Sequence, residues 1–229
     1  FLGKNAFHGD HTSANMTRFA GDPTDATTLT QAEQQLRHDV WELVRYLRAN
    51  VPEFAEAYVQ QTSPQVGPRE SRQIVGPYAL TGADIQRGAK FEDAIARGSW
   101  WIDIHCPLGR THPVHLCTAE CPQGAECPYW SAQHARMVAQ RELHPPQGDW
   151  YDIPYRSLLS IAVPNLLASG RCISATHEGM AGARVMGTCM AIGQAAGTAA
   201  ALATAQGIDP AAMAVAPLQA ALRNDGQLV

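Results

Sequence analysis

Charged residues are scarce in this sequence, and long apolar runs are absent. Lys, Arg, Asp and Glu make up 17% of the 229 residues, with a formal net charge of −4. A protein so poor in positive charge has no basic surface for a nucleic acid, so we exclude nucleic acid as a partner. No apolar run reaches the about 20 residues that cross a bilayer. The nearest, residues 188–205, is rich in Ala and Gly, so we expect no membrane span.

Two short motifs are also missing. No G-x-G-x-x-G occurs, so the chain lacks the glycine turn that usually holds the pyrophosphate of a dinucleotide. No C-x-x-C spacing occurs either, although the chain has six cysteines. No secretory signal is present, so we expect a cytoplasmic protein. The start at Phe1 instead of Met, together with the missing glycine turn, predicts a piece of a larger polypeptide.

Residues 165–205 show the clearest organisation in the chain. A short apolar run, residues 165–169, ends at Gly170 and Arg171. A loop rich in Gly and Ala follows and carries three polar side chains: His177, Glu178 and Arg184. From Thr188 nearly every residue is small and apolar, which predicts a closely packed helix. Strand, glycine turn, loop and helix in this order are typical of a cofactor site in an α/β protein.

The start of that helix is a candidate ligand site. The first turn of a helix has unpaired N–H groups and a partial positive charge, and no bulky side chain covers them at Gly187 and Thr188. An electron-rich group is able to approach such N–H groups directly. Gly193 and Gly197 predict a flat stripe for close packing on the same helix. A core helix that Thr188 caps explains these residues equally well.

Local signals predict the other elements. A capping pattern at Thr30 and Glu33, followed by apolar residues at helical spacing, predicts a helix that runs to about Asn50. Three further short segments are predicted to be helical: residues 53–61, a capped turn at residues 81–84, and a docking tail at residues 209–223 that Pro217 breaks.

Residues 100–105 alternate in polarity, as a strand with one polar face does. On such a strand Asp103 and His105 point to the same side. The carboxylate is then able to orient the imidazole and raise its basicity for proton transfer. A buried His satisfied by a neighbour explains the pattern as well. Upstream lies a charged cluster of a kind that is usually solvated at a strand edge: Arg69, Glu70 and Arg72.

Residues 106–147 hold four of the six cysteines: Cys106, Cys117, Cys121 and Cys127. Four thiolates are able to bind structural zinc or an iron–sulfur cluster, and in an exported protein they form two disulfides. Metal binding is our prediction, with disulfides and free thiols as the alternatives. Cys172 and Cys189 are expected to be small buried hydrophobes instead of redox thiols.

Six segments of the chain, taken in order, carry a family resemblance. They are NMTR (residues 15–18), RESRQIVGPYALT (69–81), WWIDIH (100–105), YDIPYRSLL (151–159), NLLASGRCISATHE (165–178) and RVMGTCMAIGQAAGTAAALA (184–203). Together they resemble a bacterial family of FAD-dependent oxidoreductases built on the two-dinucleotide-binding flavoprotein fold, distantly similar to glutathione reductase. The sequence departs from that family at Gly187, where Pro is expected. It also lacks the family's N-terminal G-x-G-x-x-G unit.

The resemblance implies an α/β fold, namely the C-terminal part of a Rossmann-like FAD-binding flavoprotein together with a mixed α+β substrate domain. It implies a substrate or cap domain at residues 1–105, a Cys-rich insertion at 106–150, the C-terminal part of the FAD-binding domain at 151–208, and a docking tail helix at 209–229. The missing G-x-G-x-x-G half implies a subunit or fragment, and we expect a second polypeptide that carries that half.

The activity implied by the resemblance is a dehydrogenase or oxidase of a small, hydroxylated organic substrate, with this chain on the flavin-ring side of the site. The expected FAD contacts are Gly170, Arg171, Met186, Gly187 and Thr188. The expected catalytic residues are His177, Arg184, His105 and Asp103, where a histidine accepts the proton and Arg184 stabilises reduced flavin. The competing class is a non-catalytic, Cys-rich metal-binding or assembly subunit that keeps a flavoprotein-like fold.

Overall fold

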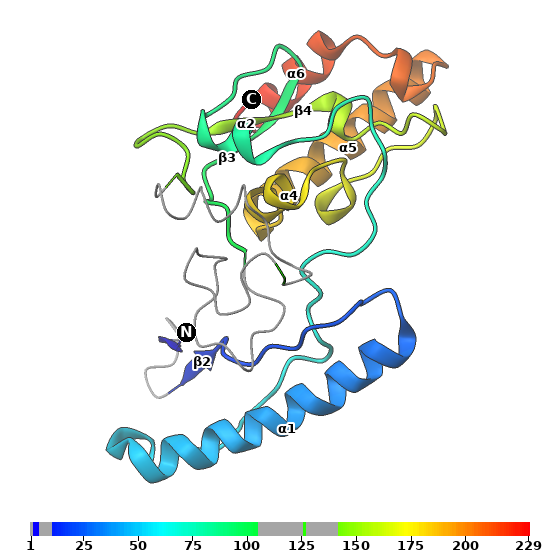
Figure 1. Cartoon of the computed structure of the whole chain (residues 1–229). Helices are drawn as coiled ribbons and strands as arrows, with labels where there is room; N and C mark the ends of the chain where they lie inside the picture. Colours follow the sequence, from blue (N-terminus) through cyan, green and yellow to red (C-terminus); the bar gives the residue numbers. More distant parts are fainter. Residues whose placement is uncertain (1, 5–10, 105–125, 127–141) are drawn as a thin grey trace. The chain divides into compact units, whose positions relative to one another are not determined.

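The computed structural model describes residues 2–4, 11–104, 126 and 142–229. The chain divides after Pro68 into two compact units. The described residues up to Pro68 are called the N-terminal unit here, and those from Arg69 onward the C-terminal unit (Figure 1). Each unit is considered by itself. The four-part division implied by the resemblance stays a prediction, because the boundary between residues 105 and 106 lies outside the described residues.

The N-terminal unit contains a small antiparallel hairpin and one long helix. β1 (Leu2–Lys4) pairs with β2 (Thr12–Ala14), and α1 spans Ala26–Asn50. The predicted cap at Thr30 is too late, because the Asp25 side chain accepts a hydrogen bond from the Thr28 N–H (2.7 Å) and caps the helix five residues earlier. The predicted end at Asn50 is confirmed.

The predicted helix over residues 53–61 is wrong. Only a single 3₁₀ turn, η1 (Pro52–Phe54), follows α1. Short helices depend on tertiary packing for their stability, and none of residues 51–60 is buried. The chain instead returns along α1, where the Arg37 guanidinium donates to Thr62 Oγ1 (2.8 Å) and pairs with Glu33 (3.1 Å).

The C-terminal unit packs helices against a two-stranded sheet. β3 (Ala94–Gly98) and β4 (Tyr151–Pro154) are antiparallel. α5 (Met186–Gln206) packs on β3, and α6 (Val215–Asn224) packs on both (Figure 1). This mixture of helices and a small sheet is consistent with the predicted α/β class. The largest fully buried side chains of the unit are Leu80, Ile85, Ile95, Ile102, Tyr151, Ile153, Tyr155, Leu158, Ile173, Met180 and Ile192.

The buried face of α5 explains why its sequence is so rich in alanine. Its inward positions recur at helical spacing: Thr188, Ile192, Ala195, Ala199 and Ala203. Small side chains at most of these positions let the helix lie close to β3. The helix ends where Gly207 takes a left-handed conformation (φ 63°), a common C-terminal cap.

The loop predicted around His177 is a helix instead. α4 (His177–Ala183) begins after Thr176, whose side chain accepts a hydrogen bond from the Gly179 N–H (3.1 Å). A Cβ built on Gly179 would overlap the carbonyl group of Leu80, so glycine lets the helix lie directly against that backbone. α4 also packs on α2 (Gly82–Gln86).

The capped turn predicted at residues 81–84 is confirmed. The Thr81 side chain accepts from the Asp84 N–H (3.2 Å), and the Asp84 carboxylate accepts from the Thr81 N–H (2.9 Å). These two reciprocal bonds form a capping box at the start of α2. The strand predicted over residues 100–105 is wrong for its described part, because residues 100–104 have no strand assignment. The Ile102 N–H donates to Leu143 O (2.8 Å), but within the described residues no neighbouring backbone hydrogen bonds extend this pairing into a sheet.

The C-terminal tail contains a short turn followed by one helix. A 3₁₀ turn, η5 (Pro210–Ala212), precedes α6. Pro217 does not break α6, because it lies in the first turn, where no N–H donor is needed. The Gln227 amide donates to the Ala191 carbonyl of α5 (3.2 Å) and to the Ile95 carbonyl of β3. These two hydrogen bonds hold the tail against α5 and β3.

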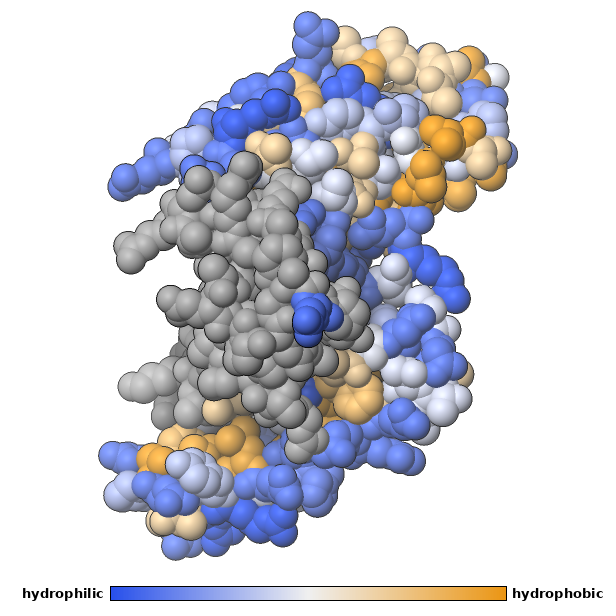
Figure 2. Space-filling model, in the orientation of Figure 1, coloured by the Kyte–Doolittle hydropathy of each residue, from blue (hydrophilic) through white to orange (hydrophobic). Residues whose placement is uncertain are grey.

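Hydrophobic residues reach the surface of the C-terminal unit. Figure 2 shows orange surface at one edge of this unit. Large hydrophobic side chains are exposed in α5 and in the loop that precedes residue 170: Ile161, Val163, Leu166, Met186 and Met190. Within the described residues no single helix is long and apolar enough to cross a membrane; only α4 and α5 taken together are, and they meet at 94°.

Candidate functional site

Backbone pairing brings two distant segments of the C-terminal unit together. The Ile74 N–H donates to Cys172 O (3.0 Å), and the Leu80 N–H donates to Ser174 O (3.1 Å). The Thr176 N–H in turn donates to Leu80 O (2.8 Å). These bonds tie the segment that follows Arg69 and Glu70 to the segment that leads into α4. The charged cluster of the RESR motif therefore lies beside the start of α4, where Arg69 and Arg72 are exposed and Glu70 is partly buried.

His177 and Glu70 form an ion pair at that junction. The Nδ1 atom of His177 contacts the Oε1 atom of Glu70. The hydrogen bond that His177 donates to Glu70 raises the pKa of His177 above its ordinary value, against the opposing effect of burial. The charge of Glu178 raises this pKa further, whereas Arg184 lowers it. The imidazole is therefore a stronger base than a free histidine, and its Nε2 is the nitrogen not used by Glu70.

Asp103 lies in the same cluster and contacts two arginines. Arg69 Nη1 donates to Asp103 Oδ2 (3.3 Å), and Arg184 Nη2 donates to the backbone carbonyl of Asp103. The prediction that Asp103 orients His105 stays a prediction, because His105 is not among the described residues. Through these two contacts Asp103 connects Arg69 with Arg184.

Arg184 connects this cluster to the start of α5. It is the C-terminal cap of α4 and immediately precedes the N-cap of α5, Val185. Burial lowers the pKa of the Arg184 guanidinium below its ordinary value, and the positive charges of Arg69 and Arg171 lower it further. Glu70 and Asp103 act in the opposite direction. The cation is thus surrounded by the other charged side chains of the cluster.

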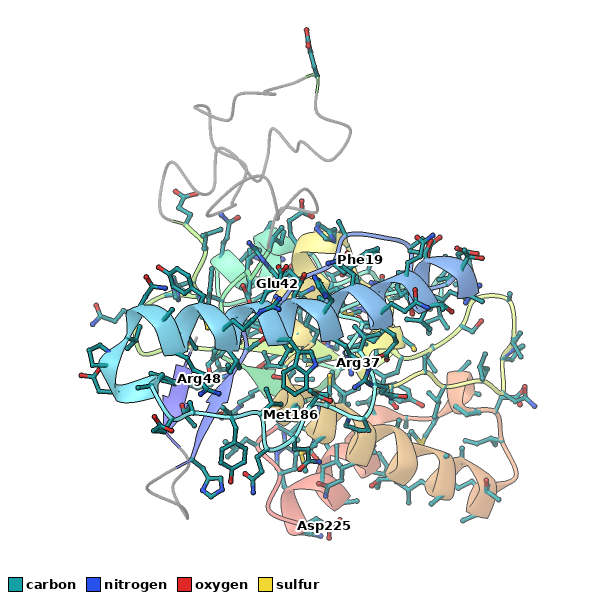
Figure 3. All side chains as sticks on the ribbon, turned by 90° about the horizontal axis from the view of Figure 1, so that it is seen from below. Phe19, Arg37, Glu42, Arg48, Met186 and Asp225 are labelled. Carbon is teal, nitrogen blue, oxygen red and sulfur yellow. The ribbon has the colours of Figure 1, made fainter. Side chains whose placement is uncertain are left out.

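The start of α5 is open. Val185 makes no side-chain capping bond, and the first N–H groups of a helix have no partner within it. A Cβ built on Gly187 would meet no described atom within 4 Å, and Met186 beside it is 82% exposed (Figure 3). Thr188 differs from its neighbours because its side chain packs inward. The helix start therefore combines N–H groups that have no partner within the helix with open space at the Cβ position of Gly187.

The glycine turn before α4 packs against this same helix start. Gly170 has φ 61°, and a Cβ built on it would lie 3.9 Å from Cys189 Sγ in α5. The turn η4 (Gly170–Cys172) thus brings Arg171 near the first turns of α5. The expected FAD contacts come from two separate segments, and the structure gathers them around one helix start: Gly170, Arg171, Met186, Gly187 and Thr188.

Two expectations for small residues are wrong. A Cβ on Gly193 or Gly197 would meet no described atom within 4 Å, so this stripe has no close packing partner among the described residues. Cys172 is exposed, because it ends the surface turn η4, and only Cys189 is partly buried. Burial raises the pKa of the Cys189 thiol, which makes it a weaker nucleophile than an ordinary cysteine.

The predicted metal site lies outside the described residues, as all four of its ligands do: Cys106, Cys117, Cys121 and Cys127. Among the residues that the structure describes, no group of three or more His, Cys, Asp or Glu side chains is arranged to hold a metal ion. The prediction of zinc or an iron–sulfur cluster has no support from the described part of the chain.

Two residues of the cluster, Arg69 and Glu70, were not among the expected site residues. The contact between Glu70 and His177 spans 107 positions of the sequence. No local periodicity reports a contact at such a distance. The signal that pointed to it was the RESR segment of the resemblance, and the usual behaviour of surface charges argued against it.

Comparison with known proteins shows the family of the chain. A family model described as FAD dependent oxidoreductase matches residues 3–222. No curated protein matches the chain, and no solved structure matches it. Because the family model covers nearly the whole sequence, the chain belongs to the FAD-dependent oxidoreductase family.

Proposed function

We propose that this chain forms the flavin-ring side of an oxidoreductase site that accepts a small hydroxylated organic substrate. The observation that carries the proposal is the open first turn of α5 beside Arg171 and Arg184. This turn has no capping side chain, and a Cβ built on Gly187 would meet no described atom within 4 Å. An electron-rich ring edge would find both donors and room there.

The residues at this place fit the ring end of FAD. When bound, FAD supplies the hydride acceptor, and the protein supplies binding, orientation and electrostatics. The partial positive charge at the start of α5 favours negative charge nearby, as do the guanidinium groups of Arg171 and Arg184. We therefore assign Gly170, Met186, Gly187 and Thr188 to ring binding. The two arginines are assigned to stabilising the charge that the ring gains on reduction.

His177 is the proposed proton acceptor. An alcohol that loses a hydride from carbon must also lose its hydroxyl proton, and a positioned base accelerates that transfer. Because Glu70 contacts Nδ1 of His177, Nε2 is the atom to which the substrate proton would go. His105, held by Asp103, is the second proposal for this role. The carboxylate of Asp103 is already paired with Arg69, which is why we place His177 first.

A second polypeptide is proposed to bind the pyrophosphate and adenine end of FAD. The G-x-G-x-x-G turn that would do so is absent from this sequence. Exposed hydrophobic side chains near α5, among them Met186 and Met190, support a tightly associated partner, since contiguous exposed apolar surface marks interaction sites. We also propose that residues 1–105 form the substrate or cap domain and that residues 209–229 form the docking tail, as the resemblance implies.

A pair of glycine variants in the complete complex tests the proposal. Gly187→Val places a branched side chain where the ring edge is expected. Gly197→Val is the matched control, because this position is also on α5 and free of described atoms to 4 Å. It lies ten residues further on, or about 15 Å along the helix. Valine is no worse than glycine in a helix, so neither change should unfold the protein.

The readout is the amount of FAD that co-purifies with each variant, measured by its visible absorption. Gly187→Val should lose FAD, whereas Gly197→Val should retain it at the level of the unaltered protein. Equal retention in both variants would show that the start of α5 does not face the flavin, and the proposed site would then be wrong.

A further inference from the structure

Glu70 is the least expected member of the cluster, and its contact with His177 has a chemical consequence. We propose that Glu70 is a positioning residue that holds His177 as one tautomer, with a proton on Nδ1 and the lone pair on Nε2. The inference rests on the proposed function, in which His177 accepts the hydroxyl proton of the substrate. It goes beyond that function by assigning a second residue and a defined protonation state to the site.

The tautomer follows from the chemistry of the two groups. An ionised carboxylate only accepts hydrogen bonds. The Nδ1 atom of His177 must therefore carry the proton that is shared with Glu70 Oε1. A neutral imidazole has one N–H only, so its other nitrogen, Nε2, is left with the lone pair. Glu70 thus keeps the basic nitrogen of His177 on the side away from itself.

The position of Glu70 is fixed by contacts that do not involve His177. Its neighbour Arg69 donates to Asp103 (3.3 Å), and the Asp103 backbone is held by Arg184. Further along, the Ile74 N–H is bonded to the segment that precedes α4. The carboxylate is therefore presented to the imidazole by a supported backbone, as a group that orients another must be.

The second carboxylate oxygen of Glu70 is buried at a cost. Oε2 has no hydrogen-bond partner among the described residues, although it is shielded from solvent. A buried polar atom without a partner costs about 1–3 kcal/mol, and a surface ion pair contributes only about 0–1 kcal/mol. Stability alone therefore does not explain this glutamate, whereas a role at His177 does.

The charges around His177 show why a carboxylate is needed there. His177 is the first residue of α4, where the helix end disfavours a cation, and Arg184 also opposes protonation. Glu70 and Glu178 favour it. The remaining charged groups, Arg69, Asp103 and Arg171, act around Arg184 and in part offset one another. Of all these groups only Glu70 bonds to the ring, so it is the one that sets ring orientation.

With FAD bound as the hydride acceptor, the substrate would lose a hydride from its carbinol carbon and its hydroxyl proton to Nε2 of His177, which would leave a carbonyl compound. The imidazolium formed in this way stays next to the ionised Glu70, which stabilises it until the proton leaves to solvent. The side chain of His177 is 55% exposed, so water is able to receive that proton.

Nitrogen NMR of the full chain in complex with its partner, with ¹⁵N-labelled histidine, tests the inference apart from turnover. Glu70→Gln keeps the shape but removes the charge, and its amide is able to donate to Nδ1 as well as accept from it. The variant should show a mixture of tautomers at His177 and a lower pKa. Glu178→Gln is the control, because it removes an equal charge that makes no bond to the ring. It should keep one tautomer.

Turnover supplies the second readout. Glu70→Gln should lower kcat/KM, and the acidic limb of the pH profile should move to lower pH with the His177 pKa. The loss should stay below the about 10²–10⁴-fold that a general base contributes, since His177 itself remains. An unchanged tautomer in Glu70→Gln would overturn the inference, and so would a tautomer mixture with unchanged kcat/KM. The NMR result stands even where no FAD is bound, so failure of the proposed function is seen separately.

Discussion

Replacing Gly179 with alanine should destabilise the protein, although alanine is the better helix former. A Cβ at this position of α4 would lie 2.6 Å from the carbonyl carbon of Leu80, whereas real Cβ atoms keep at least about 3.0 Å from such atoms. The obstacle is backbone, and the Leu80 carbonyl already accepts the Thr176 N–H. It is therefore unable to turn aside as a flexible side chain would.

The magnitude follows from two opposing effects. Overpacking in a well-packed interior costs about 1–3 kcal/mol, and we expect the upper end because both sides of the contact are backbone. The gain in helix propensity from Gly to Ala is about 1 kcal/mol. The net loss is therefore about 2 kcal/mol, which corresponds to a fall in Tm of about 4–8 °C for a protein of this size.

Thermal unfolding followed by circular dichroism measures this loss. Gly197→Ala on α5 is the control, because a Cβ there would meet no described atom within 4 Å. That variant should be slightly more stable, by up to about 1 kcal/mol. If Gly179→Ala proves as stable as Gly197→Ala, the close approach of α4 to the Leu80 backbone is wrong. The position of His177 at the start of α4 would then be wrong as well.

Three further predictions concern the charged cluster and the tail. Arg184→Ala should lower the flavin potential by about 30–65 mV in a redox titration. A charge-assisted hydrogen bond is worth about 1.5–3 kcal/mol, and 30 mV corresponds to about 1.4 kcal/mol for a two-electron couple. An unchanged potential would show that this arginine has a structural role only. Because Glu70 raises the pKa of folded His177 above its unfolded value, their pairing should stabilise the protein at acidic pH and cease to do so as pH rises through the folded pKa. The difference in unfolding free energy between the unaltered protein and Glu70→Gln should therefore shrink from acidic to neutral pH, and a difference that grows would contradict the pairing. Gln227→Ala should remove two hydrogen bonds from the tail and cost about 1–3 kcal/mol, seen as faster amide hydrogen exchange in α6; unchanged exchange would show that the tail is held by apolar packing alone.

Local signals in the sequence were reliable where the controlling interaction is itself local. The capping box of Thr81 and Asp84 lies within four residues, and both of its bonds form. Pro52 marks the end of α1 for a similar reason. The start of α1 was misplaced because two adjacent segments both offer good caps. Asp25 and Thr30 compete, and Asp25 caps the longer helix.

Elements that depend on distant contacts were not readable from the sequence. α4 contains two glycines and looks like a loop, yet those glycines are what let it pack on the Leu80 backbone and beside Ile85. The site shows the same limit. Its helix start at Gly187 was visible as a pattern of small residues, whereas the pairing of Glu70 with His177 requires the segment after Glu70 to lie along the one before α4.

The visible absorption spectrum of the purified complex tests the central claim most directly. This chain, isolated together with its natural partner, should carry a flavin spectrum in a fixed ratio to the protein. Anaerobic addition of a substrate alcohol should bleach that spectrum. A complex that is folded and colourless, and that stays colourless after incubation with FAD, would contradict the account.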